Sequence, residues 1–174
     1  MRSFLYSIAL ALTVQQHFAV ATEWTDGPFK KAVKAYIADP AAGEAEHGPI
    51  STWDTSKVTK MDYLFTYADQ FNEDISGWDT SNVDDMSGMF DNAKRFNADI
   101  SGWNVGKVTS MYAMFTYAAS FNQNLNGWKI DQVQDMSGMF WEAISFDQKL
   151  CWDIPSTTKT DWMFFKINAK LACE

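Results

Sequence analysis

Histidine and cysteine are scarce in this sequence, with two of each among 174 residues. His47 is the one histidine outside the first 21 residues, and the chain has no Cys-x-x-Cys pair. A structural zinc site takes four ligands, mostly cysteine and histidine, so we expect no metal site and no cofactor. A serine–histidine–aspartate triad is also not expected, because His47 stands in a segment rich in glycine and acidic residues and is better interpreted as a satisfied or solvated side chain.

Positive charge is also in short supply. The chain has 14 lysine and arginine residues against 22 aspartate and glutamate residues, for a net charge of −8. A phosphate backbone is repelled by such a protein, and no basic stripe overrides the repulsion, so nucleic acid is not an expected partner. Carboxylate pairs such as Asp84 and Asp85, or Asp69 and Glu73, would suit a glycosidase, but recurring acidic residues are more typical of a solvated face, and we expect no enzyme.

Oxygen ligands for calcium recur in two columns that do not persist. Each column has two aspartates and an asparagine before Lys129 or Lys149 takes the next place (Asp54, Asp79 and Asn104; Asp74, Asp99 and Asn124). No calcium-loop sequence accompanies them, so specific calcium sites are not expected.

No apolar run is long enough to span a bilayer. The longest, residues 4–14, is about half of the roughly 20 residues that a membrane helix needs. It follows Arg2 and precedes Ala19-Val20-Ala21, the small-x-small pattern of signal-peptide cleavage. We therefore predict a signal peptide at residues 1–21, a mature chain that begins at Thr22, and a secreted protein, extracellular or at the cell surface, without a membrane span.

Large apolar side chains are abundant, by contrast, and they recur every 25 residues. Six columns keep this register, each in four copies (Trp53, Trp78, Trp103, Trp128; Val58, Val83, Val108, Val133; Met61, Met86, Met111, Met136; Phe65, Phe90, Phe115, Phe140; Ala68, Ala93, Ala118, Ala143; Phe71, Phe96, Phe121, Phe146). A fixed period of this length is typical of stacked units that bury their apolar faces against one another. We predict that these columns form the core.

Two local patterns recur within each unit. Met86, Met89, Phe90 and Ala93 have the one-face spacing of a short amphipathic helix, and residues 74–78 have the pattern of a short strand and turn. Stacking would place the strands in a narrow parallel sheet, so the sequence predicts an α/β repeat solenoid with short parallel strands and short helices. A polar column is expected to satisfy buried backbone groups (Asn72, Asn97, Asn122, Asp147).

A second period of 50 residues lies over the first. Residues 65–68 return as 115–118, and residues 86–90 return as 136–140. Duplication of a two-unit block is the simplest explanation, and it predicts a surface whose chemistry alternates from one unit to the next.

The two ends differ from the middle. We expect a helical N-terminal cap in residues 22–49, four repeats in residues 50–150 and a degenerate closing repeat in residues 151–174. The cap helix is predicted between Pro28 and Asp39. Because an oxidising compartment favours pairing, the two cysteines of the closing repeat, Cys151 and Cys173, are candidates for a disulfide.

The first repeat is similar to that of a known family. Residues 53–61, followed by Leu64-Phe65, Ala68 and Phe71-Asn72, resemble the repeat of the BspA-like leucine-rich-repeat surface proteins, also known as the domain of unknown function 285. The resemblance covers roughly residues 28–165. It implies a leucine-rich-repeat-like solenoid outside the cell, in some members an adhesin that binds host or matrix proteins, and it does not imply an enzyme.

Several aromatic residues fall beside the core columns (Tyr63, Tyr67, Tyr112, Tyr117 and Trp141). Solvent-facing tyrosine and tryptophan are typical of protein- and sugar-binding surfaces. We predict that Tyr67, Tyr117 and Trp141 form one binding face for an extracellular protein, with polysaccharide as the second ligand class. The alternatives are that these side chains only widen the core, or that the protein is a structural matrix component that self-associates.

Overall fold

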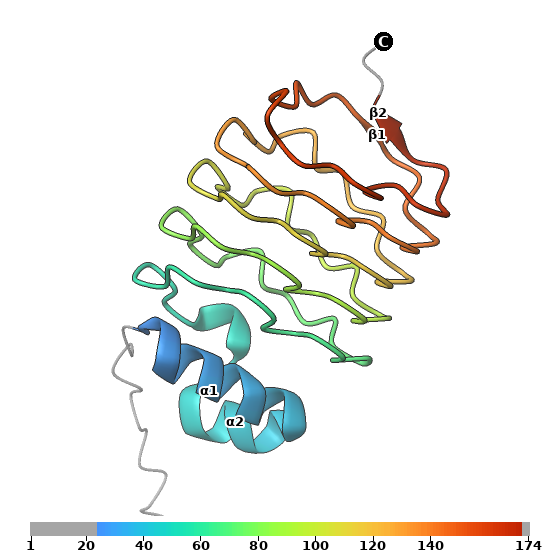
Figure 1. Cartoon of the computed structure of the whole chain (residues 1–174). Coiled ribbons are helices and arrows are strands. Elements are labelled where there is room, and N and C mark those ends of the chain that lie inside the picture. Colours follow the sequence, from blue (N-terminus) through green and yellow to red (C-terminus); the bar gives the residue numbers. More distant parts are fainter. Residues whose placement is uncertain (1–23, 172–174) are drawn as a thin grey trace, which may run out of the picture.

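The computed structural model describes residues 24–171 (Figure 1). Helix α1 (Asp26–Ala38) and helix α2 (Pro40–His47) come first, followed by the short 3-10 helix η1 (Ile50–Thr52). Strands β1 (Lys149–Leu150) and β2 (Lys170–Leu171) pair in parallel near the C-terminal end. The predicted signal peptide lies outside the described residues and stays a prediction.

Between η1 and β1 the chain forms a series of units stacked one upon another (Figure 1). Isolated parallel bridges connect equivalent residues of successive units, from Lys60 through Asp85, Ser110 and Asp135 to Lys159. The 25-residue period of the sequence is therefore also the spacing of hydrogen-bonded neighbours in the structure.

Successive backbone amides in each unit donate alternately within the unit and to the next unit. The amides of Met89, Asp91 and Ala93 close turns onto carbonyls three residues earlier, at 3.0 to 3.3 Å. The amides between them donate instead to the next unit (Met86 to Ser110, Gly88 to Tyr112, Phe90 to Met114, Asn92 to Thr116). The units are thus held together by every second amide of this segment.

This use of the amides corrects the predicted secondary structure of the repeats. Residues 86–93 form overlapping turns and no helix, because a helix would bond its amides within the segment and leave none for the next unit. Residues 74–78 form a turn at Ser76 and Gly77 with no strand.

Two positions in each unit have left-handed backbone, with φ between 52° and 64° (Tyr63, Gly88, Ala113, Gly138 and Trp162; Tyr67, Asn92, Tyr117, Glu142 and Lys166). Glycine adopts this conformation freely and asparagine readily, whereas other residues do so at a cost of about 1–2 kcal/mol. The recurring geometry of the stack therefore holds several bulky side chains in a conformation that they do not favour.

The predicted core columns are confirmed. All six are buried along the four repeats. Phenylalanine rings stack from unit to unit, with centroids 5.4 Å apart for Phe65 and Phe90 and 5.6 Å for Phe90 and Phe115. The tryptophans from the second unit onward also donate their indole N–H groups to carbonyls 27 or 28 residues earlier, as Trp78 does to the Ile50 carbonyl at 2.9 Å (Trp78, Trp103, Trp128 and Trp152).

The polar columns stabilise turns at the surface. The Asn72 Oδ1 atom accepts from the Asn97 amide at 2.7 Å, and the contact recurs at Asn122, so this column bonds the backbone as predicted but from exposed or half-buried positions. In the columns considered as calcium ligands, Asp74 Oδ1 accepts from the Ser76 amide at 2.9 Å, and Asp54 does the same for Ser56 at 3.0 Å. These acidic side chains cap turns.

Helix α1 covers the first unit. Its apolar residues include Phe29, whose ring centroid lies 5.2 Å from that of Trp78. The helix predicted between Pro28 and Asp39 is confirmed and begins two residues earlier, at Asp26. Helix α2 then starts at Pro40, where the Asp39 side chain accepts from the Ala42 amide.

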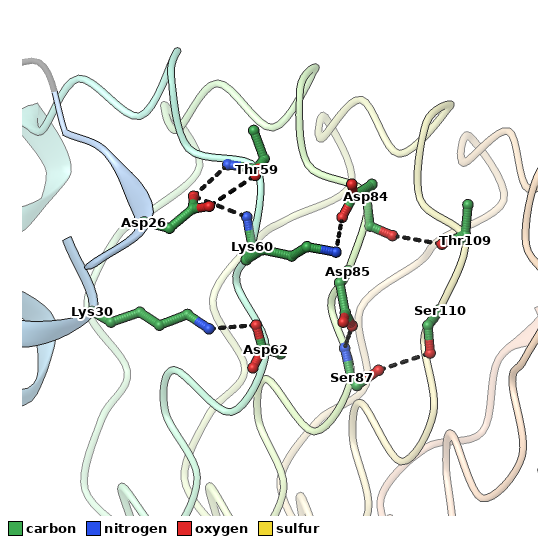
Figure 2. Close-up of polar contacts among 10 residues, drawn as sticks. All are labelled: Asp26, Lys30, Thr59, Lys60, Asp62, Asp84, Asp85, Ser87, Thr109 and Ser110. Atoms are coloured by element: carbon green, nitrogen blue, oxygen red, sulfur yellow. Dashed lines mark hydrogen bonds and ion pairs between the residues drawn. The ribbon is translucent and has the colours of Figure 1, made fainter. Parts of the chain in front are cut away.

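The contact between α1 and the first unit is polar at its edge (Figure 2). In later units the amide at this position donates to the preceding unit, as Asp84 does to the Thr59 carbonyl at 2.9 Å. The first unit has no predecessor, and the Asp26 carboxylate accepts from the Thr59 amide at 2.7 Å, the Thr59 hydroxyl at 2.8 Å and the Lys60 amide at 3.1 Å. Lys30 adds an ion pair with Asp62. Asp26 thus closes the edge of the stack.

Candidate functional site

The three predicted binding residues are partly or largely exposed but do not share one hollow. Tyr67 is 70% exposed and lines a cavity of about 330 Å³ beside Tyr36 and Pro40 of the helical region. Trp141 is half-buried and lines a different groove. Tyr117, 41% exposed, lies next to Trp141, since its amide donates to the Trp141 carbonyl at 2.8 Å. Tyr117 and Trp141 are therefore neighbours, and Tyr67 stands apart at the capped end.

The groove that contains Trp141 crosses the units on one face of the stack. We refer to it as the aromatic groove; it has a volume of about 360 Å³ and draws residues from five successive units (Tyr63; Asp91; Tyr112, Ala113 and Thr116; Ser137, Gly138 and Trp141; Asp161 and Trp162). Its size falls within the range of small-ligand and side-chain pockets.

The groove forms where the two 50-residue blocks differ. In the first block the ring of Tyr63 lies over Gly88, so that a Cβ atom on Gly88 would come within 2.3 Å of it. In the second block Ala113 replaces the tyrosine, and a Cβ atom on Gly138 would have no neighbour closer than 3.8 Å. The space that a ring fills in one block is therefore open in the other.

Tryptophan rings line the C-terminal part of the aromatic groove. Trp141 and Trp162 have centroids 6.0 Å apart, and Phe165 lies behind both, at 4.9 Å from Trp141 and 5.2 Å from Trp162. Trp162 is nevertheless 62% exposed. Packing against Phe165 holds the rings in place while leaving apolar surface for a ligand.

The charges that line the groove are all negative. Asp91 and Asp161 are its two ionisable carboxylates, and no lysine or arginine is among the lining residues. Burial raises the pKa of Asp91, although the Asn92 amide donates to its carboxylate at 2.8 Å and lowers the pKa in part. The pKa of Tyr63 is also raised, first by burial and then by Tyr112 and Asp85 nearby.

Three of the carboxylates considered for catalysis, Asp69, Asp84 and Asp85, and the histidine have structural partners. Asp69 pairs with Lys94 at 2.8 Å. Asp84 pairs with Lys60 at 2.6 Å, and Asp85 accepts from the Ser87 amide at 2.9 Å (Figure 2). The His47 ring packs edge-on against Trp24, with centroids 5.1 Å apart. Within residues 24–171, no group of three or more histidine, cysteine, aspartate or glutamate side chains is placed to hold a metal ion.

The closing repeat brings two distant segments together. In the register of β1 with β2, Lys149 pairs with Lys170 and Leu150 with Leu171. Cys151 follows Leu150 directly, and its amide donates to Asn126 Oδ1 at 2.6 Å. Cys173 lies outside the described residues, and its pairing with Cys151 stays a prediction.

One family model matches the chain, over residues 77–171, and that family is described as "Mycoplasma protein of unknown function, DUF285". The chain belongs to this family. The DUF285 match includes Asp91, Tyr112, Trp141 and Trp162 of the aromatic groove. No curated protein and no solved structure matches the chain.

The part of the chain that the structure describes contains no helix long and apolar enough to cross a membrane.

Both carboxylates of the groove, Asp91 and Asp161, and one of its two tryptophans, Trp162, were not predicted as binding residues from the sequence. Comparison of the two 50-residue blocks would have indicated this face, because Asp91 in the first corresponds to Trp141 in the second, and Tyr63 to Ala113. These positions differ between the blocks, so they are not part of the repeated pattern.

Proposed function

We propose that this chain is a secreted repeat solenoid of the BspA-like leucine-rich-repeat type, whose role is to bind another extracellular macromolecule, in the first place a protein, without catalysis. The aromatic groove carries the proposal. Exposed tyrosine and tryptophan on a rigid scaffold bury a large area at little loss of side-chain entropy, and such residues dominate the energetics of many binding sites.

The location outside the cell is supported by the leader sequence, which ends in Ala19-Val20-Ala21. Mass analysis of protein exported by an expressing cell should find Thr22 as the first residue. Recovery of exported protein that begins at Met1 would contradict cleavage.

Capture of surface or secreted material by the full chain tests the binding role. We expect the chain to retain a partner and a variant with alanine at Tyr112, Trp141 and Trp162 to lose it. Alanine at Tyr67, Tyr117 and Trp141 tests the face predicted from the sequence. Thermal unfolding of each variant serves as the folding control, and a folded groove variant with full capture would move the site elsewhere.

Two other outcomes separate the alternatives. Capture of polysaccharide in place of protein would favour the second ligand class. Light scattering that rises with protein concentration, with no captured partner, would favour a self-associating matrix component.

A further inference from the structure

We infer that the aromatic groove seats the ammonium group of a lysine side chain presented by a basic protein partner. The inference rests on the proposed binding function and names the chemistry of its partner. It follows from the combination of aromatic rings, unpaired carboxylates and an opening that the neighbouring block lacks.

The rings supply the first part of the recognition. A cation is attracted to the face of an aromatic ring within about 6 Å of its centroid, most strongly for tryptophan. Trp141 and Trp162 lie 6.0 Å apart and both line the groove with Tyr63 and Tyr112. A slender side chain that enters between these residues can bring its ammonium group close to more than one ring.

The carboxylates supply the second part. Neither Asp91 nor Asp161 forms an ion pair with any residue in the described part of the chain, although lysines neutralise acidic groups elsewhere, as Lys94 does for Asp69 and Lys166 for Glu142. Burial raises the pKa of Asp91, so its ionised form is less favourable there than in water. No lysine or arginine is among the residues that line the groove beside it. A bound ammonium group would provide a positive charge, and the net charge of −8 favours approach of a basic partner.

Comparison of equivalent repeat positions suggests a substitution that should fill the groove. Ala113 and Tyr63 are equivalent residues with similar left-handed backbone, φ 52° and 55°, so the backbone of residue 113 can hold a tyrosine. In Ala113→Tyr the new ring should cover Gly138 as the ring of Tyr63 covers Gly88. The substitution leaves the charge of the protein unchanged, which separates the groove from general electrostatic attraction.

Calorimetric titration of the full chain with tetralysine tests the inference. We expect saturable binding that weakens at least tenfold when the lysine side chains are acetylated, because acetylation removes the charge. Ala113→Tyr and Trp162→Ala should each weaken binding about tenfold, and Asp91→Asn severalfold. Asp153→Asn removes the same charge at an exposed site outside the groove lining. It should leave binding within about twofold, because salt screens exposed charges.

The inference is overturned if tetralysine does not bind, if acetylated tetralysine binds equally well, or if the folded Ala113→Tyr and Trp162→Ala variants both retain full affinity. Should Ala113→Tyr fail to fold, Trp162→Ala and Asp91→Asn decide the matter. Capture of a protein partner with any of these negative results would leave the proposed function standing and remove only the lysine. Loss of all capture would remove the proposed function itself.

Discussion

The ring of Tyr63 occupies the space directly in front of Gly88, close enough that a Cβ atom on that glycine would lie 2.3 Å from Tyr63 Cε1. The equivalent glycine of the second block, Gly138, faces the aromatic groove and would place a Cβ atom no closer than 3.8 Å to Thr116. Gly88 and Gly138 occupy equivalent repeat positions, but only Gly138 has room for a larger side chain.

We expect Gly88→Ala to lower the free energy of unfolding more than Gly138→Ala. Both glycines have positive φ, 57° and 64°, so each substitution should cost about 1–2 kcal/mol in backbone strain. Gly88→Ala adds a clash with Tyr63, worth roughly 1 kcal/mol more. Urea unfolding measures both, and the difference should vanish when Tyr63 is also replaced by alanine; a difference that survives would place its cause elsewhere.

The phenylalanine columns should dominate stability. Phe90 is fully buried, with its centroid 3.7 Å from that of Phe96, and Phe90→Ala should cost roughly 3–5 kcal/mol. Met111→Ala should cost roughly 2–5 kcal/mol for the same reason. Ile144 is 70% exposed, so Ile144→Ala is the matched control, with a change within about 0.5 kcal/mol. Losses below about 1 kcal/mol at both buried sites would contradict the packing of these columns.

Asp26 should make the capped end sensitive to acid. Partial burial would raise the pKa of Asp26, but hydrogen bonds from Thr59 and Lys60 outweigh it and hold the pKa below its ordinary value. A carboxylate with a lowered pKa in the folded state contributes stability above its unfolded pKa of about 3.9, and that contribution is lost as pH falls through the folded pKa. Asp26→Asn should therefore lower the Tm at pH 7 and have a much smaller effect near pH 2. An equal shift of Tm at both pH values would contradict a role for the ionised carboxylate.

The left-handed tyrosines give a separate test of the predicted face. The residue equivalent to Tyr67 and Tyr117 in the second unit is Asn92, also with left-handed φ. Tyr67→Asn should therefore leave the free energy of unfolding unchanged or raise it by up to about 1 kcal/mol. Tyr67→Val, with a branched Cβ, should lower the free energy of unfolding. If Tyr67→Asn instead destabilises strongly, the ring contributes to packing in the cavity it shares with Tyr36.

The predicted disulfide is open to direct measurement. Thiol titration of native secreted protein should find no free cysteine, and Cys151→Ser should cost about 3 kcal/mol in the chain-entropy model for a loop of this size. Two free thiols in the native protein would contradict the pairing of Cys151 with Cys173.

The buried residues could be predicted from the sequence, but the conformation of their backbone could not. Met86, Met89, Phe90 and Ala93 are buried as a helix would bury them, yet they lie on overlapping turns. The spacing of apolar residues indicates which side chains face inward. A helix and a series of overlapping turns produce the same spacing here, so the spacing does not distinguish them. How the amides are shared between neighbouring units depends on contacts 24 residues apart, which local patterns do not contain.

The candidate site was harder to predict for a different reason. Its opening arises from one difference between otherwise similar blocks, Tyr63 against Ala113, and from the closing repeat, which supplies Trp162 out of exact register. Tyr117 and Trp141 are neighbours in the structure, whereas Tyr67, which was assigned to the same face because it shares a repeat position with Tyr117, lines a separate cavity. A binding role for these residues stays a prediction. The cavity beside Tyr67 depends on α1 and α2, whose position over the first unit is set by tertiary packing.

The alternating amides also give the stack a direction. Along the segment that begins at Met86, each unit donates to the carbonyls of the next, so bonds of this set all point toward the C-terminal end. The corresponding amides of the last unit, at Thr160, Trp162, Phe164 and Lys166, donate to no backbone carbonyl of residues 24–171. That end presents donors, and a second copy would present donors in turn, while α1 covers the opposite end. Two copies therefore cannot continue the ladder face to face, and any strand that extends it must bring carbonyl groups of its own.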